Sequence, residues 1–435
     1  MREKSEYGDV AKSVLKLFEK TKVDDSWSFA ECGRKETSKW THGYHRYPAK
    51  FIPQIVERLF DEYVTGDDVH INDPFYGSGT TIVSAIARGY RASGTDINGI
   101  AHLMTKVKAT PIEPSYLEER VERFLRRVRE EQDVEPEIPE RHIERINYWF
   151  HEDTKLELGR ILSIIRDEED EQVRDFLLVG FSHILKSCSI WLQRSTKPTR
   201  DKHKIPKEPQ NLLKIHLLKM LRGNESFYKE VPPKVRESIG EHLDIALGDA
   251  RNQFAEDDST DLIVSSSPYV TSYEYADLHQ LSTIWLDFTD NLTQYRTGFI
   301  GSASRSMNHQ VLKSEIANNI VLEMKDMSRK LSQEIESFFF DMEQAFDESY
   351  RILKTTGRCC FVIGNTHLKN VKLSNSQVFA ENIKLSGFNL ERIIKRKIIS
   401  KSLPQTRDRR TGRFTSTSMA TSVAYPFEYI IVGRK

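Results

Sequence analysis

Apolar residues recur along the chain in two patterns, one typical of amphipathic helices and one typical of buried strands. Leu331, Ile335 and Phe338 recur at helical spacing and predict a long helix that runs through Leu353 and ends at Gly357. Short apolar runs predict seven strands, at Val69 to Asn72, Arg91 to Thr95, Leu243 to Leu247, Asp261 to Val264, Arg358 to Ile363, Phe388 to Arg396 and Glu428 to Val432. Because helical segments alternate with these strands, we predict an α/β fold with a mainly parallel sheet.

The strand pattern stops between residues 115 and about 243, where the apolar spacing is helical. Helices are expected at Glu118 to Gln132, Asp153 to Arg166, Gln172 to Arg194 and Asn211 to Arg222, with proline-containing breaks between them. The sequence therefore predicts a large helical insertion within an α/β domain. The expected parts are an N-terminal extension (1–40), a first α/β part (41–114), the insertion (115–242) and a second α/β part (243–435).

The composition is that of an ordinary globular protein, with 38% apolar and 29% charged residues. No apolar run reaches the roughly 18 residues of a membrane span, and no apolar segment near the amino terminus suggests a secretory signal. The four cysteines, Cys32, Cys188, Cys359 and Cys360, lack the spacing of metal ligands. We therefore expect no metal site, no membrane association and a reducing prokaryotic cytoplasm.

Positive charge is clustered, although the net charge is zero. Ten basic residues accompany two acidic ones between positions 186 and 222, and nine accompany two between 391 and 413. Such clusters are the usual sign of phosphate contact, and the alternative is a merely solvated face. The residues expected to contact DNA phosphates are Arg194, Lys197, Arg200, Lys202, Lys204, Lys395, Lys397, Arg409 and Arg410.

A glycine-punctuated turn from Asp73 to Thr81 separates the first predicted strand from a helix. Gly77 and Gly79 permit positive φ angles and a close approach of the backbone to a ligand, and the helix amino terminus offers unpaired N–H donors. The next strand ends in Asp96, where α/β nucleotide-binding folds place an acid against ribose hydroxyls. Together these residues predict a nucleotide-type cofactor site.

Two motifs resemble those of the S-adenosylmethionine-dependent DNA amino methyltransferases. They are Asp73-Pro74-Phe75-Tyr76-Gly77-Ser78-Gly79-Thr80-Thr81 and, after the strand at Asp261 to Val264, Ser265-Ser266-Ser267-Pro268-Tyr269. Their order is that of the α group, in which target recognition lies between the cofactor and catalytic parts. The resemblance implies a Rossmann-like methyltransferase fold with a mostly parallel seven-stranded sheet, S-adenosyl-L-methionine as cofactor and double-stranded DNA as substrate.

The resemblance also implies roles for individual residues in cofactor binding. Tyr47-Pro48-Ala49-Lys50-Phe51 is similar to the segment that holds the methionine end of the cofactor. Asp249 stands where the family binds the adenine amino group, and an ordinary strand-end turn is the alternative there. The family often has Asn-Pro where this chain has Asn98-Gly99. The expected cofactor-binding residues are Tyr47, Pro48, Lys50, Phe51, Asp73, Pro74, Phe75, Gly77, Ser78, Gly79, Thr80, Thr81, Asp96, Asn98, Asp249 and Ala250.

The expected catalytic residues are Ser266, Ser267, Pro268 and Tyr269. The lone pair of a base amino group is delocalised, so methylation requires acceptors for its two protons, here the Ser266 hydroxyl oxygen and the Ser267 carbonyl. Pro268 fixes φ, and the Tyr269 ring would stack on a base swung out of the duplex. The polar loop at 289–320, which contains Gly298 to Ser302, is expected to cover the site.

In the family, Ser at the position of Ser266 favours cytosine N4 as the methylated atom, whereas Asp or Asn favours adenine N6. Ser267 replaces the first proline of the common Ser-Pro-Pro-Tyr, which reduces the rigidity of the loop. Adenine N6 methylation, guanine N2 methylation of transfer RNA and a catalytically silent nucleic-acid-binding protein stay open. Cytosine C5 methylation is disfavoured, because no Pro-Cys dipeptide occurs. We expect a nucleoid-associated enzyme of a restriction-modification system, paired with a restriction endonuclease for the same site but with no obligatory protein partner.

Overall fold

A seven-stranded sheet forms the centre of the computed structural model, which describes residues 2–47, 51–195, 197–270, 275–302, 311–398, 406–407, 422–423 and 427–435. From one edge to the other its strands are β3 (Leu243–Leu247), β2 (Arg91–Asp96), β1 (His70–Asp73), β4 (Thr260–Ser266), β5 (Leu353–Gly364), β11 (Phe427–Arg434) and β8 (Asn389–Lys397). β11 is antiparallel to both neighbours, and the other adjacent pairs are parallel. All seven predicted strands lie in this sheet, and the prediction of a Rossmann-like α/β fold is confirmed.

Helices cover both faces of the sheet, and the alternation of side chains along β5 shows how. Cys359, Phe361 and Ile363 pack in one core with α16 (Glu315–Met327), α17 (Arg329–Ile352) and α18 (Asn375–Leu385). Cys360 and Val362 point to the opposite face, where they share a core with α3 (Pro53–Tyr63) and α4 (Thr80–Ala87). Successive residues of a strand face opposite sides, so a strand covered on both faces is apolar throughout.

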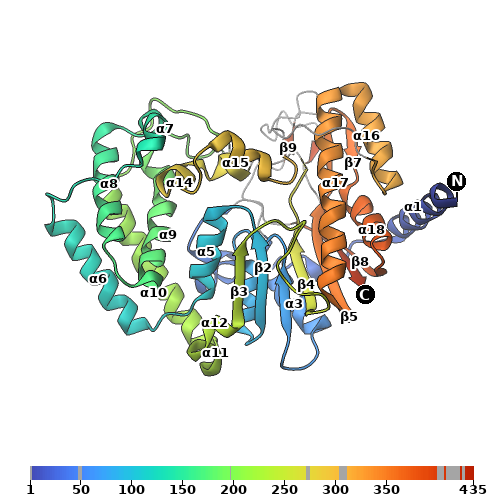
Figure 1. Cartoon of the computed structure of the whole chain (residues 1–435), viewed down its shortest axis with the longest axis horizontal. Helices are drawn as coiled ribbons and strands as arrows, with labels where there is room; N and C mark the ends of the chain where they lie inside the picture. The colour runs from blue at the N-terminus through green and yellow to red at the C-terminus, as the bar shows by residue number, and fades with distance from the viewer. Residues whose placement is uncertain are drawn as a thin grey trace.

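The segment between β2 and β3 is helical, as predicted. After α5 (Gly99–Ala109) it contains α6 (Pro114–Glu130), η3 (Glu140–His142), α7 (Ile143–Trp149), α8 (Glu152–Arg166), α9 (Glu171–Cys188), α10 (Pro209–Glu230), α11 (Pro233–Glu237) and α12 (Ile239–His242). Its core includes α5 and α14 (Gln280–Trp285), through residues such as Met104 and Trp285. Figure 1 shows this insertion beside the β3 edge, with α16 and α17 at the other end of the molecule. The insertion is therefore packed against the sheet domain through a shared core.

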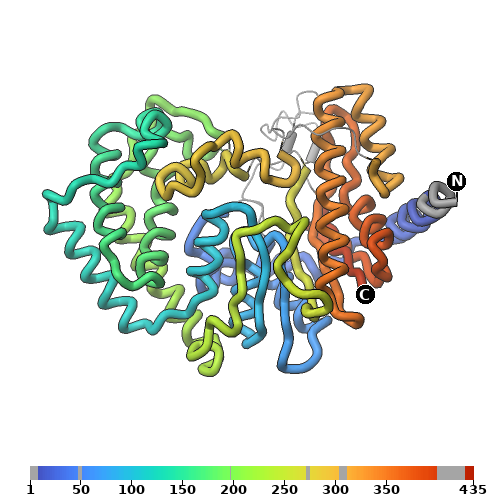
Figure 2. Tube along the Cα trace, viewed as in Figure 1, coloured from blue at the N-terminus to red at the C-terminus, as the bar shows by residue number. Residues whose placement is uncertain are grey.

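The amino-terminal segment covers the other edge of the sheet. It contains α1 (Arg2–Lys20), η1 (Asp25–Trp27), α2 (Arg34–Thr37) and η2 (Trp40–Gly43). Val23 forms a parallel bridge with Lys395 of β8, and the Asp24 amide donates to the Lys395 carbonyl at 2.8 Å. Trp27 is fully buried in the core that contains α3 and α4. Figure 2 shows α1 and the end of β11 on the side of the molecule away from the insertion.

The end of the long helix differs from the prediction. α17 ends at Ile352 and β5 begins at Leu353, which pairs with Thr260 of β4, so the expected continuation to Gly357 is wrong. Leu353 is fully buried in the strand. A buried position satisfies a helical pattern as well as a strand, which is why the spacing alone did not mark this boundary.

The remaining elements are short. They are α13 (Tyr275–Leu278), α15 (Leu292–Gly298) and two small hairpins, β6 (Thr366–Leu368) with β7 (Val371–Leu373) and β9 (Thr406–Arg407) with β10 (Ser422–Val423). Within the described ranges, none of the helices combines the length and the apolar character that crossing a bilayer requires.

Candidate active site

The turn between β1 and α4 has the backbone geometry that its glycines predict. Gly77 and Gly79 have φ angles of +49° and +74°. A Cβ atom on Gly79 would lie 2.7 Å from the Thr105 hydroxyl oxygen, and one on Gly77 would lie 3.2 Å from the Tyr47 ring. Glycine is therefore required twice over at Gly79, by the positive φ angle and by the close approach of α5.

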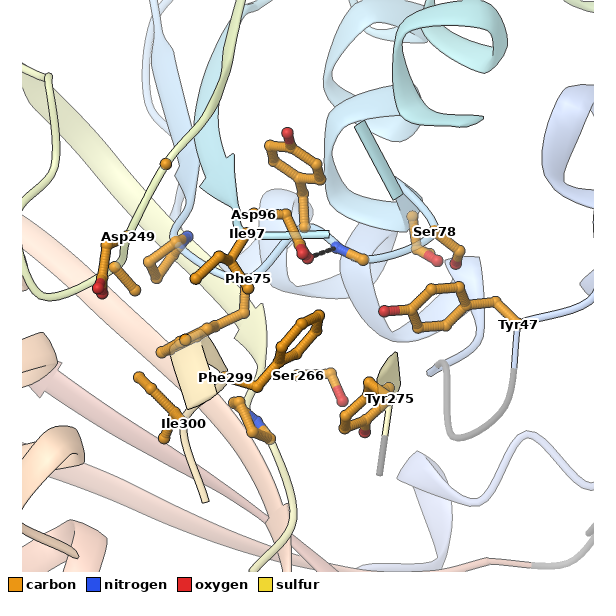
Figure 3. A pocket seen from close by; sticks show the side chains of 18 of the residues that line it. Tyr47, Phe75, Ser78, Asp96, Ile97, Asp249, Ser266, Tyr275, Phe299 and Ile300 are labelled. Atoms are coloured by element: carbon orange, nitrogen blue, oxygen red, sulfur yellow. Dashed lines mark hydrogen bonds between the residues drawn. The ribbon is translucent and has the colours of Figure 1, made fainter. Parts of the chain in front are cut away.

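Asp96 lies at the carboxyl end of β2 and faces this turn (Figure 3). One of its carboxylate oxygens accepts the Gly77 amide at 2.9 Å, and the other accepts the Asn98 amide at the same distance. Burial raises the pKa of Asp96 to about 6, so the carboxylate is mainly ionised at neutral pH. The site thus holds one negative charge beside the glycine turn.

Ser266 ends β4, the strand next to β1, and lines the same cavity as the glycine turn. Because β1, β2 and β4 run parallel, their carboxyl ends meet at one edge of the sheet, where open α/β sheets bind ligands. The cavity is lined by Tyr47, Phe51, Pro74, Phe75, Tyr76, Gly77, Ser78, Thr80, Asp96, Ile97, Gly248, Asp249, Ala250, Ser266, Pro268, Tyr275, Gly298, Phe299 and Ile300.

Known proteins match the chain over its first quarter and, more weakly, along most of its length. A model of the DNA methylase family matches residues 2–106, which include the glycine turn and Asp96. The Type II methyltransferase M.MvaI of Kocuria varians is 25% identical over 413 residues, 88% of this chain and 89% of its own length. The Type II methyltransferase M.BsoBI of Geobacillus stearothermophilus is 21% identical over 383 residues, 74% of each chain. The chain is thus similar to DNA methylases and to Type II methyltransferases.

The predicted resemblance is thus confirmed, and S-adenosylmethionine as the cofactor agrees with the DNA methylase match. These relatives do not distinguish cytosine N4 from adenine N6 as the methylated atom. Among solved structures, a TehB-like S-adenosylmethionine-dependent methyltransferase of Corynebacterium glutamicum aligns with a TM-score of 0.28 at 10% identity, over 87% of this chain and 86% of its own. So low a score adds nothing to the fold assignment, which rests on the sheet itself.

Most residues that the methyltransferase motifs single out face the cavity. Twelve of them line it: Tyr47, Phe51, Pro74, Phe75, Gly77, Ser78, Thr80, Asp96, Asp249, Ala250, Ser266 and Pro268. Pro48 and Lys50, and the DNA-contact candidates Arg409 and Arg410, lie outside the described residues. Gly298, Phe299 and Ile300 of the segment expected to cover the site do line the cavity, but the expectation of an irregular loop at 289–320 is wrong in part, because α15 (Leu292–Gly298) and the start of α16 (Glu315–Met327) lie within it.

Three other members of the cofactor motifs brace the site without lining the cavity. Asp73 accepts the Ser265 hydroxyl at 2.7 Å and the Phe75 amide at 3.1 Å, and burial raises its pKa to about 7. The Thr81 hydroxyl donates to the Val264 carbonyl at 2.9 Å. Gly79 begins α4 in the left-handed conformation. These contacts fix the glycine turn against β4, the strand that carries Ser266.

Asn98 and Asp249 have protein partners of their own. The Asn98 side-chain oxygen caps α5 by accepting the Ile100 amide at 3.3 Å. Asp249 pairs with Arg251, whose Nη2 lies 2.5 Å from Oδ2, and Arg251 also reaches Asp341 at 2.6 Å. The Asp249 carboxylate at the cavity therefore shares the Arg251 guanidinium with the Asp341 carboxylate.

Ser267 and Tyr269 turn away from the cavity. The Ser267 hydroxyl is buried and has no hydrogen-bond partner among the described residues, whereas its amide donates to Val362 at 3.3 Å. The Tyr269 hydroxyl donates to Glu428 of β11 at 3.2 Å, and Glu428 pairs with Arg396 at 2.6 Å. The aromatic rings that line the cavity on the carboxyl-terminal side of the Ser-Pro-Tyr motif are those of Tyr275 and Phe299. Sequence analysis missed Tyr275, since it belongs to neither motif.

Three buried histidines, His45, His216 and His279, and the partly buried His183 lie between the cofactor segment and the insertion. The His279 ring stacks on Tyr47 at 5.0 Å, and the rings of His45 and His279 are 6.2 Å apart. His183 of α9 stacks on His216 of α10 with centroids 3.7 Å apart. Burial lowers the pKa of His216 and His279 to about 4 and holds the pKa of His45 and His183 well below the usual range. The imidazoles in this contact are therefore neutral at physiological pH.

The predicted DNA-contact residues of the insertion lie on the loop between α9 and α10. Arg194, Lys197, Arg200 and Lys202 are exposed, and the Arg200 guanidinium lies 4.4 Å from the centre of the Tyr148 ring. Lys204 instead donates to the backbone carbonyls of Lys186 and Trp191 at 2.7 and 2.8 Å, so it holds the loop together. Partial burial lowers the pKa of Lys204 to about 8.

The second basic segment begins at the same sheet edge as the cavity. β8 runs in the direction of β4 and β5, because it is antiparallel to β11, which is antiparallel to β5. Its last residues therefore lie at the edge that carries Ser266. Lys397 is exposed there, and the Lys395 ammonium lies over the Phe427 ring at 4.7 Å.

Proposed function

We propose that this protein transfers a methyl group from S-adenosylmethionine to the N4 amino group of cytosine in duplex DNA. One observation carries the proposal: Ser266 lines the same cavity as the glycine turn and Asp96. A methyl acceptor held at Ser266 would thus face a cofactor held by the turn, as direct transfer requires.

The residues present suit this cofactor. Gly77 brings its backbone to the cavity wall without a side chain, and Ser78 and Thr80 line the cavity beside it at the amino terminus of α4, a position that favours anionic and hydrogen-bonding ligands. Asp96 offers carboxylate oxygens to ribose hydroxyls, and Tyr47 and Phe51 would flank the methionine end. Asp249 and Ala250 would contact the adenine. When bound, the cofactor supplies the electrophilic methyl group.

Ser266 and Ser267 would then orient the amino nitrogen. The Ser266 hydroxyl oxygen and the Ser267 carbonyl would accept its two protons and direct its lone pair at the methyl carbon. The Ser267 amide is held by Val362 at 3.3 Å, and Pro268 limits φ in the next residue, which helps to fix the carbonyl between them. Tyr269 would contact the swung-out base after the loop adjusts.

Duplex DNA as the substrate is supported by the relatives and by surface charge. Two relatives are Type II methyltransferases, which supports a place in a restriction-modification system beside an endonuclease for the same site. Exposed cations at Arg194, Lys197, Arg200 and Lys202 on the insertion, and at Lys397 on the sheet edge that also carries Ser266, would contact phosphates.

The test is to incubate the protein with S-adenosylmethionine and unmethylated genomic DNA, or transfer RNA, and to identify methylated nucleosides by mass spectrometry. N4-methylcytosine is expected. N6-methyladenine would show that Ser266 does not select the base, and methylguanine in RNA alone would overturn the DNA substrate.

The Ser266→Ala variant tests the role of the hydroxyl in the same assay. Its rate should fall roughly 100- to 1,000-fold, the usual effect of removing one transition-state hydrogen bond. Ser84→Ala is a matched control, because Ser84 is buried on α4 and its hydroxyl has no hydrogen-bond partner within the described part of the chain. Equal rates for the two variants would remove Ser266 from the mechanism.

A further inference from the structure

Six aromatic side chains line the cavity: Tyr47, Phe51, Phe75, Tyr76, Tyr275 and Phe299. Of these, Tyr47, Tyr275 and Phe299 come from three separate segments outside the glycine turn and the Ser-Pro-Tyr motif (Figure 3). The Tyr47 and Tyr275 rings are stacked at an angle of 23° with centroids 6.1 Å apart, and His279 continues the stack on Tyr47 at 5.0 Å. The cavity thus has an aromatic wall, defined here as Tyr47, Tyr275 and Phe299, that neither sequence motif supplies as a unit.

The charges around this wall favour a cationic ligand. None of the described lining residues is a lysine or arginine, and Asp96 contributes a carboxylate. Burial raises the pKa of Tyr47, so its ring carries an intact hydroxyl at physiological pH. The faces of neutral aromatic rings attract cations, most strongly where water is excluded.

The proposed cofactor and its product differ in charge at one atom. The amino nitrogen forms a bond to the methyl carbon, the electrons of the broken carbon–sulfur bond return to sulfur, and a proton leaves the nitrogen. The sulfonium cation therefore becomes a neutral thioether. A site that senses this charge distinguishes the substrate from the product by more than the loss of one methyl group.

We infer that the aromatic wall makes the cavity selective for the sulfonium form of the cofactor over S-adenosylhomocysteine. This inference rests on the proposed function. It assigns Tyr275, outside both motifs, a role in cofactor discrimination and product release.

Calorimetric titration tests the inference with three ligands: S-adenosylmethionine, S-adenosylhomocysteine and sinefungin, whose amine carries positive charge in place of the sulfonium. Tyr275→Leu should weaken binding of the two cationic ligands by roughly 3- to 30-fold and leave the neutral product nearly unchanged. Tyr275→Phe keeps the ring and should preserve the selectivity. Tyr116→Leu is the control for removal of a tyrosine elsewhere, since Tyr116 lies on α6 and donates to Asp170 at 2.7 Å.

Equal weakening of all three ligands by Tyr275→Leu would overturn the inference, because the ring would then serve only as apolar contact. Unchanged binding of all three would also overturn it. Phe299→Leu repeats the test on a second segment, in case Tyr275→Leu fails to fold as judged by circular dichroism. If the unaltered protein binds none of the three ligands, the proposed function itself fails.

Discussion

The carboxyl edge of the sheet and the helical insertion are built under different constraints. At the edge, Gly77 and Gly79 adopt positive φ angles, and a Cβ atom on Gly94 would lie 2.2 Å from the Asp73 carbonyl oxygen. In the insertion, apolar residues fill a core and exposed cations lie on a loop. Chemistry that depends on backbone geometry restricts residue identity, whereas phosphate contact restricts only charge. The edge therefore carries recognisable motifs and the insertion carries none.

The two regions also respond oppositely to protons. The pKa is raised to about 6 in Asp96 and about 7 in Asp73, so these carboxyl groups bind protons more readily in the folded chain. The rings of His45, His183, His216 and His279, which lie between the cofactor segment and the insertion, are here called the insertion contact. The pKa is lowered to about 4 in His216 and His279, so this contact resists protonation in the folded chain. Acidification should therefore loosen the insertion contact while the edge carboxyl groups oppose global unfolding.

The largest effect is expected from Gly79→Ala, because Gly79 is the position of the carboxyl edge at which both the φ angle and a neighbouring side chain exclude a Cβ atom. The positive φ angle and the 2.7 Å approach of a Cβ atom to Thr105 should together lower the free energy of unfolding by about 1–3 kcal/mol and weaken cofactor binding at least tenfold. Chemical denaturation and calorimetry measure the two effects. Gly66→Ala is the control, since Gly66 has a φ angle of +92° and no atom within 4 Å of an added Cβ. Equal effects in both variants would mean that the Thr105 contact is unimportant.

An effect on stability of similar size is expected when the insertion contact is acidified. A histidine whose pKa is about 4 when folded and about 6.5 when unfolded stabilises the fold fully above pH 6.5, and this stability is lost as the pH falls toward 4. At pH 5 the stability falls by about 1–2 kcal/mol for each such histidine. Hydrogen exchange at pH 5 and 7.5 should show that α9 and α10 lose protection on acidification before β1 and β4 do.

His183→Phe sharpens this test, because phenylalanine keeps a ring against His216 but cannot be protonated. The variant should lose less stability between pH 7.5 and 5 than the unaltered protein. His203→Asn, which changes an exposed histidine of the basic loop, is the matched control. An unchanged pH dependence in His183→Phe would remove His183 from the acid response.

The smallest effect is expected on the insertion surface. Replacing both Lys197 and Arg200 by Ala should weaken DNA binding and reduce the slope of log affinity against log salt by roughly 0.9 for each phosphate that the variant no longer neutralises. Lys204→Ala should leave the slope unchanged, because the Lys204 ammonium is bonded to backbone carbonyls of its own loop. Fluorescence anisotropy at several salt concentrations measures both. An unchanged slope in the double variant would remove the loop from the interface.

The sequence predicted the strands better than the orientations of the motif side chains. All seven strands were found. The carboxyl-terminal half of β5 reads as an apolar run because both of its faces are buried, whereas the edge strands β3 and β8 are only partly buried. The motifs supplied twelve lining residues, but they could not show that Asp73 and Thr81 point toward β4 instead of the cavity. Neighbouring serines illustrate the reason. The Ser265 hydroxyl donates to Asp73 while Ser266 lines the cavity, because successive residues of β4 point to opposite sides of the strand.

Tyr275 shows a second limit of sequence interpretation. Its ring and that of His279, four residues later, both stack on Tyr47, which lies more than 200 residues earlier in the chain. Contacts across such separations depend on how the segment before β1 packs against the segment after β4. A local pattern of residue types contains no information about that packing.

The amino-terminal segment has a consequence for solution behaviour. An uncovered edge strand presents unpaired N–H and C=O groups that can pair with a second molecule. Here Val23 and Asp24 pair with Lys395 on β8, and the Arg396 side chain donates to the Trp27 carbonyl at 2.7 Å. The segment thus covers the edge of the sheet against edge-to-edge pairing, and removing it would expose both the unpaired edge of β8 and the core positions that Trp27 and Val14 fill.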